Sequence, residues 1–259
     1  MRLRDKVIVV TGGTSGIGQA MVERAVGEGA RVLVHGIDRA AGEKLVARLG
    51  TGTVLHLDDL GDPASAARTV AAAIAAFGRI DGLVNNAAIV ARSNLGNTSA
   101  AMFDRIMAVN VRAPLLLIQA AFPHLKAAAG TVLNIGSINA HSGQPNLLDY
   151  SLSKGALQTL SRNLANAHAA DRVRVNHLNV GWVLTEREYA HQIEHGMPVD
   201  WPERVPEQFA PSGRLILPAE VAAAAVYWLG DESRPISGSV VDFEQFPVIG
   251  RNPNKREVK

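Results

Sequence analysis

The chain has 259 residues, 47% of them hydrophobic and 19% charged, with a formal net charge of +2 at pH 7. These values favour a sizeable buried core over intrinsic disorder, and so small a charge gives no reason to expect a nucleic-acid partner. There is no cysteine, which excludes a disulfide framework and a thiolate metal site and fits a reducing compartment.

We expect neither a leader peptide nor a membrane span. The start of the chain is charged and leads directly into a strand-like run. No apolar run reaches the roughly 20 residues needed to cross a bilayer. The basic end of the chain, 251–259, is typical of a solvated terminus rather than a phosphate-binding patch. The expected location is therefore cytoplasmic.

Strands and helices alternate along the chain. The β-branched run Lys6–Val10 predicts a buried strand, and a helical pattern covers Gln19–Glu28. Further strands are expected at 31–35, 53–57, 80–84, 131–135 and 239–243, with early helices at 39–49 and 63–77. Alternation at this spacing, without a Pro-, Gly- or Ser-rich linker, predicts one doubly wound α/β domain with a parallel sheet.

A glycine-rich turn, Thr11–Gly18, joins the first strand to the first helix, and Gly12, Gly16 and Gly18 in it have the spacing G-x-x-x-G-x-G. Glycines let the backbone turn tightly and approach a pyrophosphate, and the helix N-terminus offers it unpaired amides. The strand–turn–helix context favours a dinucleotide site over a plain turn.

The end of the second strand bears on the choice of cofactor. An acidic residue there holds the ribose 2′-OH of NAD, whereas a nearby Arg favours the 2′-phosphate of NADP. The order Asp38-Arg39 presents both charges. Because Asp38 would repel a phosphate, we lean towards NAD and leave NADP open. The alternative is that Asp38 only caps the following helix.

Tyr150 and Lys154 are four residues apart, so in a helix they lie on one face, one turn apart. A free phenol has a pKa of about 10, too high for easy proton exchange near neutrality, and a nearby ammonium lowers that pKa. Ser137 follows a strand-like apolar run, and its hydroxyl can hold the oxygen whose proton Tyr150 exchanges. The alternative is a helix with an ordinary surface Tyr and Lys.

With these residues in place, the chain resembles the short-chain dehydrogenase/reductase family over 6–242. The resemblance rests on the order and spacing of Thr11–Gly18, Asp59–Leu60, Asn85–Ala88, Val109–Val111, Ser137, Tyr150–Lys154 and Arg174–Asn176. It implies a single Rossmann-type domain over 1–259 with a seven-stranded parallel sheet. It also implies hydride transfer between NAD(P)(H) and a secondary alcohol or carbonyl.

The resemblance further implies a catalytic tetrad. Tyr150 would be the general acid/base, Lys154 would lower its pKa and bond the nicotinamide ribose, Ser137 would orient the substrate oxygen, and Asn110 would hold a relay water. In the cofactor site, Asp59 would bind adenine and Thr185 would touch the carboxamide. The full set of implied cofactor-binding residues is Gly12, Thr14, Ser15, Gly16, Ile17, Gly18, Asp38, Asp59, Leu60, Asn86, Ala87, Tyr150, Lys154, Val183 and Thr185.

Three positions depart from the family pattern. Ala88 stands where a glycine is usual. Val180-Gly181-Trp182 replaces the usual Pro-Gly, which restores a backbone N–H and adds bulk near the nicotinamide end. The glycine pair after the last strand is missing, and Glu244-Gln245 follows Phe243 instead.

The stretch from about 185 to 217, with four prolines, is expected to be a substrate lid, because ligands bind outside the carboxyl ends of the strands. The alternative is a packed surface excursion. His191 and His195 have a spacing that can hold a metal, but no third ligand is evident, so we expect no metal.

A polar segment lies between Ser137 and Tyr150. It contains Asn139, His141, Gln144 and Asn146, which would suit a hydroxylated substrate such as a sugar or polyol. A solvated loop is the open alternative.

Two apolar helices, expected at 102–117 and 150–164, predict a homo-oligomer, a dimer or a tetramer, by the same resemblance. The competing reading of the whole chain is a cofactor-binding sensor or scaffold without turnover. It predicts a damaged tetrad, whereas all four positions are filled.

Overall fold

The computed structural model describes residues 1–250 and has a seven-stranded sheet with the order β3-β2-β1-β4-β5-β6-β7. Every neighbouring pair of strands is parallel. The strands are β1 (Val7–Val10), β2 (Arg31–Gly36), β3 (Thr53–Leu57), β4 (Gly82–Asn85), β5 (Thr131–Ser137), β6 (Arg174–Val180) and β7 (Val240–Phe243). The predicted doubly wound α/β fold is confirmed.

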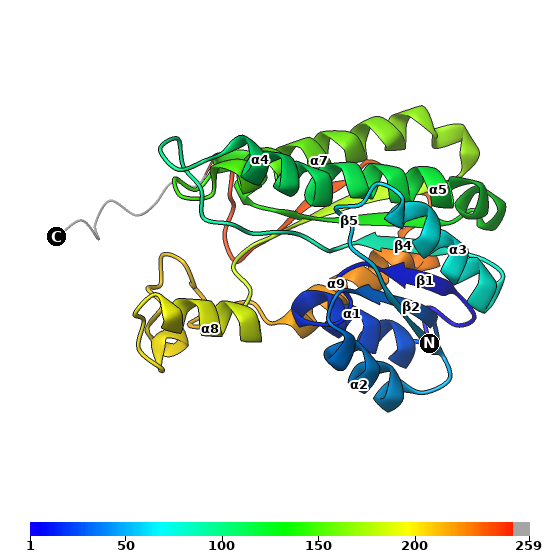
Figure 1. Ribbon diagram of the computed structural model, residues 1–259, viewed down its shortest axis with the longest axis horizontal. Helices are drawn as coiled ribbons and strands as arrows, with labels where there is room; N and C mark the ends of the chain where they lie inside the picture. The colour runs from blue at the N-terminus through cyan, green and yellow to red at the C-terminus, as the bar shows by residue number, and fades with distance from the viewer. Residues whose placement is uncertain (251–259) are drawn as a thin grey trace.

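Helices cover both faces of the sheet (Figure 1). One layer contains α3, α4, α5 and α7, and the other contains α1, α2 and α9. The helices are α1 (Gly16–Gly27), α2 (Arg39–Leu49), α3 (Ser65–Phe77), α4 (Ala100–Met107), α5 (Ala113–Ala128), α6 (Asn139–Ser142), α7 (Leu148–Ala167), α8 (Glu186–Glu194) and α9 (Pro218–Leu229). Short helical turns lie at η1 (Ala108–Arg112), η2 (Ala169–Asp171), η3 (Trp201–Arg204) and η4 (Asp231–Ser233).

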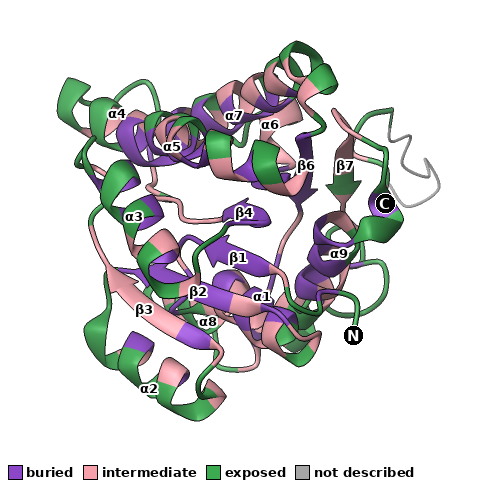
Figure 2. Cartoon of the chain, turned by 90° about the vertical axis from the view of Figure 1, so that its right-hand side faces the viewer, coloured by how far each residue is buried: buried purple, intermediate pink, exposed green. Residues whose placement is uncertain are grey.

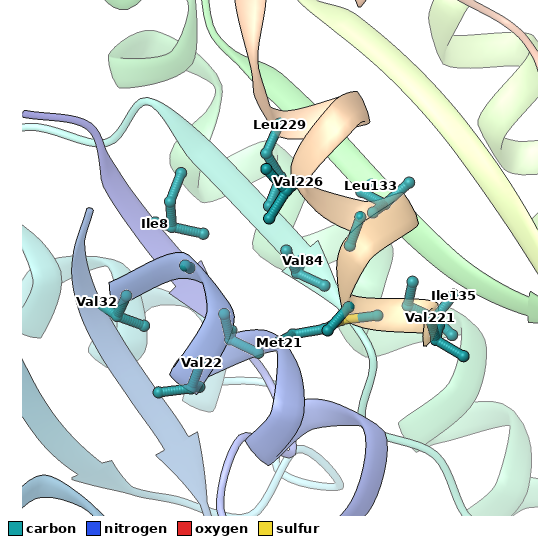
Figure 3. Packing of buried hydrophobic residues seen from close by; sticks show 14 of the residues in the cluster. Ile8, Met21, Val22, Val32, Val84, Leu133, Ile135, Val221, Val226 and Leu229 are labelled. Atoms are coloured by element: carbon teal, nitrogen blue, oxygen red, sulfur yellow. The ribbon is translucent and has the colours of Figure 1, made fainter. Parts of the chain in front are cut away.

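The first core lies between the sheet and the α1–α9 layer. Met21 and Val22 of α1 and Val226 of α9 pack over the strands, against residues such as Val84 and Leu133 (Figure 3). All five are at most 2% exposed. Burying a side chain of this size contributes about 1.5–3 kcal/mol, so this layer holds β1 and β4 rigidly under the glycine turn.

The second core lies on the opposite face, where Leu117 and Leu125 of α5 and Val70 of α3 pack on Val9 and Val132. Strands β1, β4, β5 and β6 are buried throughout, as expected for parallel strands covered on both faces. The outer strands β3 and β7 are only partly buried (Figure 2).

The long helix expected at 102–117 is interrupted. The chain runs from α4 through one π-helical turn, η1, into α5. Such turns are rare and occur often at functional sites, and η1 contains Asn110. Helix α3 also starts later than expected, at Ser65, because Asp62 turns its carboxylate to the amide of Ala64 and holds a turn there.

Within 1–250, one helical run, Ala100–Ala127, is long and apolar enough to cross a membrane by length and composition alone. The sequence-based expectation missed it because charged residues divide the run. Core helices of globular proteins pass the same test, and α5 within this run packs on the sheet.

Candidate active site

The glycine turn at the end of β1 has the geometry that a diphosphate requires. Gly12 and Gly16 have φ values of +62° and +53°, and a Cβ on Gly18 would lie 2.0 Å from the Gly12 carbonyl oxygen. Ser15 precedes α1 without capping it through its side chain, and the first amides of a helix have no acceptor within it. The turn therefore fits an anionic group, and a dinucleotide suits it.

Thr11 fixes this turn to the neighbouring strand. Its hydroxyl donates to the Val84 carbonyl and accepts from the amides of Asn86 and Ala87, at 3.0 and 3.1 Å. The Asn86 side chain in turn donates to the carbonyl oxygens of Thr11 and Gly12. The ends of β1 and β4, between which the strand order reverses, thus form one rigid edge.

The two acidic residues expected at the adenosine end both have protein partners. The Asp38 carboxylate accepts from the Ala41 amide at 3.0 Å and caps α2 while staying exposed. The Asp59 carboxylate accepts from the Gly61 amide and pairs with Arg105 at 2.9 Å, which lowers its pKa. Leu60 is buried in the second core.

Tyr150, Lys154 and Ser137 meet at the carboxyl end of β5. Helix α7 places Lys154 one turn after Tyr150, with its Nζ 5.6 Å from the centre of the phenol ring. Nζ donates to the carbonyl of Ile135 at 2.7 Å. Ser137 ends β5, and its hydroxyl hydrogen-bonds the phenol of Tyr150 and accepts from the Asn139 amide. The three side chains converge as expected.

Burial shifts both titrating groups away from their ordinary pKa values. It raises the pKa of Tyr150 to about 12, an effect that the Ser137 hydrogen bond opposes. It lowers the pKa of Lys154 to about 8. We expected Lys154 to lower the pKa of Tyr150, but here the ammonium bonds a main-chain carbonyl and burial dominates, so the phenol stays protonated.

Asn110 connects α7 with the loop that follows β4. Its Oδ1 accepts from the Ile89 amide at 2.8 Å, while Nδ2 donates to the Ile89 carbonyl and to the Ser153 hydroxyl, each at 3.0 Å. Both polar atoms of the side chain are engaged by protein groups. A relay water near Asn110 would therefore depend on main-chain atoms, and the relay stays a prediction.

The expected lid begins next to the glycine turn. A Cβ on Gly16 would lie 3.4 Å from Cγ2 of Thr185, and Thr185 caps α8 by accepting from the Glu188 amide. Val183 is buried and bridges to Ile216. Helix α8 and the loop after it project from the body of the molecule (Figure 1).

The His141 ring is engaged by protein groups rather than left free for a substrate. Its Nε2 lies 2.9 Å from the Asp242 carboxylate and 3.0 Å from Nδ2 of Asn179. That amide also donates to Gln158 of α7, so the ring belongs to a network between α6, α7 and the ends of β6 and β7. Asn139 stays partly exposed, and Gln144 and Asn146 are exposed.

The rings of His191 and His195 lie 4.1 Å apart. In the part of the chain that the structure describes, no group of three His, Asp or Glu side chains could hold a metal ion.

Sequence reasoning missed several partners of these groups. Ser153, Arg105 and the Ile135 carbonyl each bind a proposed site residue, but no local pattern identifies them, because each contact joins distant segments. The role of Thr11 in joining β1 to β4 was also missed. Its position at the end of the first strand, within the glycine motif, was the signal that could have indicated it.

The chain is similar to known proteins over most of its length. A family profile described as enoyl-(acyl carrier protein) reductase matches residues 12–244. 2-(S)-hydroxypropyl-CoM dehydrogenase 3 of Xanthobacter autotrophicus is 35% identical over 242 residues, which are 92% of this chain and 94% of that protein. L-fucose dehydrogenase of Mus musculus is 35% identical over 229 residues, 87% of this chain and 82% of that protein.

A solved structure is similar over almost the whole chain. The 3-ketoacyl-(acyl-carrier-protein) reductase from Brucella melitensis, complexed with NADH, has a TM-score of 0.82 and 30% identity, and the match covers 93% of this chain and 97% of that one. The protein is therefore an NAD(P)-dependent oxidoreductase, and it belongs to the short-chain dehydrogenase/reductase family.

Proposed function

We propose that this enzyme interconverts a secondary alcohol and the corresponding carbonyl compound, with Tyr150 as the general acid/base. The observation that carries the proposal is the meeting of Ser137, Tyr150 and Lys154 at the carboxyl end of β5. The sensor or scaffold without turnover has no observation of its own in its favour, because the proposed proton-transfer groups are all present.

The proposed division of labour follows from the position of each group. The nicotinamide cofactor supplies or accepts the hydride. Ser137 orients the substrate oxygen, and in reduction Tyr150 donates its phenolic proton to that oxygen. Lys154, in its charged form, stabilises the phenolate that remains, because opposite charges attract strongly in a buried site. In oxidation the same proton moves back to Tyr150.

The diphosphate of the cofactor would bind to the glycine turn, through Gly12, Thr14, Ser15 and the first turn of α1. Asn86, Ala87 and the ends of β4 and α8 would border the rest of it. The preference that we propose is NAD. The exposed Asp38 side chain lies just after the end of β2, and the nearby Arg39 is already paired with Glu43 at 3.2 Å.

We propose a hydroxylated substrate, such as a sugar or polyol, covered by the lid at 185–217. The segment between Ser137 and Tyr150 contains the exposed amides of Gln144 and Asn146 and the partly exposed Asn139. Hydroxyl groups pair well with such amides. L-fucose dehydrogenase, among the relatives, is named for a sugar. His141 no longer supports this proposal, because its ring is bound to Asp242.

The proposed assembly is a homo-oligomer, a dimer or a tetramer, which sedimentation velocity would distinguish from a monomer. Leu115 of α5 and Leu152 of α7 are 42% and 52% exposed, and burying such side chains against a second copy is favourable. We propose a cytoplasmic location, since the absence of cysteine suits a reducing compartment.

Tyr150→Phe removes the proposed proton donor and keeps the ring. We expect turnover to fall by about 10²–10⁴-fold, the usual contribution of a placed acid or base, with NADH binding unchanged by fluorescence titration. Tyr227→Phe on α9 is the matched control and should be fully active. Near-normal turnover of the Tyr150 variant would contradict its assignment.

The rate of carbonyl reduction should depend on the charge of Lys154. The pKa of Tyr150 is about 12, so the phenol is protonated at every working pH. The pKa of Lys154 is about 8, so its ammonium is present below that pH and is lost above it. We therefore expect kcat/KM for reduction to decline as the pH rises through about 8. A profile that is flat from pH 7 to 9.5 would exclude this role.

Asp38→Asn tests the cofactor preference without removing the helix cap, since Asn caps as well as Asp. We expect the wild-type protein to bind NADH more tightly than NADPH. The variant should bind NADPH severalfold more tightly than the wild type does, because the repulsion is gone. Equal affinities of the wild type for both cofactors would refute the preference.

A substrate panel tests the proposed substrate class. It contains sugars, polyols, steroids, 3-oxoacyl thioesters and 2-hydroxypropyl-coenzyme M, each assayed with both cofactors. We expect the highest kcat/KM with a sugar or polyol. Activity confined to apolar ketones would contradict the proposal, and tight cofactor binding without turnover on any compound would favour the sensor.

A further inference from the structure

The lid is joined to the body of the molecule by a narrow stalk, which we define as residues 182–184 and 214–216. The two limbs of the stalk are bridged through Val183 and Ile216. The Leu184 amide donates to the Ile216 carbonyl at 2.8 Å, and the Ile216 amide donates to the Trp182 carbonyl at 3.2 Å. Contacts that hold the two limbs in place therefore determine the position of both ends of the lid.

Glu244 binds the first limb. Strand β7 ends at Phe243, whose carbonyl accepts from the Gly181 amide at 3.0 Å. The next residue, Glu244, turns its carboxylate onto the main chain there, and its Oε2 accepts from the Trp182 amide at 3.3 Å. A Cβ on Gly181 would lie 2.0 Å from that oxygen. Position 181 must therefore be glycine for the carboxylate to lie where it does.

Gln245 binds the second limb and the residues just before it. Its Oε1 accepts from the amide of Ser212 at 3.0 Å and from the hydroxyl of Ser212 at 2.6 Å. Its Nε2 donates to the Arg214 carbonyl at 2.8 Å. The main-chain N–H of Gln245 donates to Oε1 of Glu244 at 2.7 Å. The two side chains thus act as one clamp across both limbs.

The first limb also carries the contact that orients the lid. The Trp182 ring stacks on Trp201 with centroids 5.7 Å apart and an angle of 19° between the planes. Its Nε1 donates to the Glu188 carboxylate of α8 at 2.9 Å. Trp201 is fully buried in a separate small core with Ala210 and Leu215. A shift of the Trp182 main chain would therefore move the whole lid.

We propose that Glu244 and Gln245 are positioning residues that hold the stalk and so set the closed position of the lid over the substrate. The proposal rests on the proposed role of 185–217 as a substrate lid. Neither side chain takes part in proton or hydride transfer. Their effect is on substrate affinity, because a lid that opens more often holds substrate less well.

The central variant is Gln245→Met, which keeps the length of the side chain and removes its hydrogen bonds. Glu244→Ala removes the other half of the clamp. Ser212→Ala removes the hydroxyl contacts with Gln245 and with the Arg214 carbonyl, and it keeps the hydrogen bond from the Ser212 amide to Gln245. Glu232→Gln, at an exposed ion pair with Arg2, is the control. The first readout is trypsin cleavage at Arg187 and Arg204, which are exposed in the lid. The second is near-ultraviolet circular dichroism of the Trp182–Trp201 stack, with Trp201→Phe as the reference for its loss.

We expect cleavage of the lid to be roughly tenfold faster in Gln245→Met and Glu244→Ala, because losing two or three hydrogen bonds raises the open population by about that factor. The circular dichroism should shift towards that of Trp201→Phe. KM for the best compound of the panel should rise, while kcat at saturating substrate and NADH stays near the wild-type value. Ser212→Ala should show a smaller change in the same direction, which keeps the test valid should a clamp variant fail to fold.

Cleavage and circular dichroism at wild-type values in Gln245→Met and Glu244→Ala would overturn the clamp. Both readouts work without substrate, so this failure is distinct from a failure of the proposed reaction. Faster cleavage with an unchanged KM would overturn the role in substrate binding, and it would leave the assignment of Tyr150 untouched.

Discussion

A buried ammonium is the constraint on which the site depends. Lys154 is 2% exposed, and among the ion pairs of residues 1–250 no carboxylate is joined to it. Its Nζ donates instead to the carbonyl of Ile135. Lowering the pKa from 10.5 to about 8 corresponds to roughly 3 kcal/mol against the charged form. A side chain that costs this much in the core is tolerated because a fold with two rigid layers supplies the stability.

The sheet determines where that charge lies. Parallel order brings the ends of β1, β4, β5 and β6 to one edge, so the glycine turn and Ser137 share it although they are far apart in sequence. Helix α7 then crosses this edge with Tyr150 and Lys154 on its inner face. Its position is held by Asn110, through Ser153, and by the π-helical turn that aims Asn110 inwards. The interrupted helix is thus part of how the site is built.

What could be predicted from the sequence followed from local patterns. Hydrophobic runs located six of the seven strands, all but β6, and the i, i+4 spacing brought Tyr150 and Lys154 together, since both depend only on neighbouring residues. The occupied carboxylate of Asp59, the His141–Asp242 pair and the carbonyl partner of Lys154 depend on segments that are 46, 101 and 19 residues apart. No periodicity contains that information, so the electrostatics of the site had to come from the structure.

Two of the departures from the family pattern belong to one structural unit. Val180 ends β6 in register with Phe243 of β7, and the next amide, that of Gly181, donates to the Phe243 carbonyl. That pairing brings Glu244, the residue after β7, beside Gly181. The Glu244 carboxylate fits there because Gly181 has no side chain. A flexible glycine pair at 244 and 245 would leave the stalk without these hydrogen bonds. Val180 and Glu244-Gln245 therefore replace a proline-stiffened turn with a polar clamp, which holds the same main chain by different chemistry.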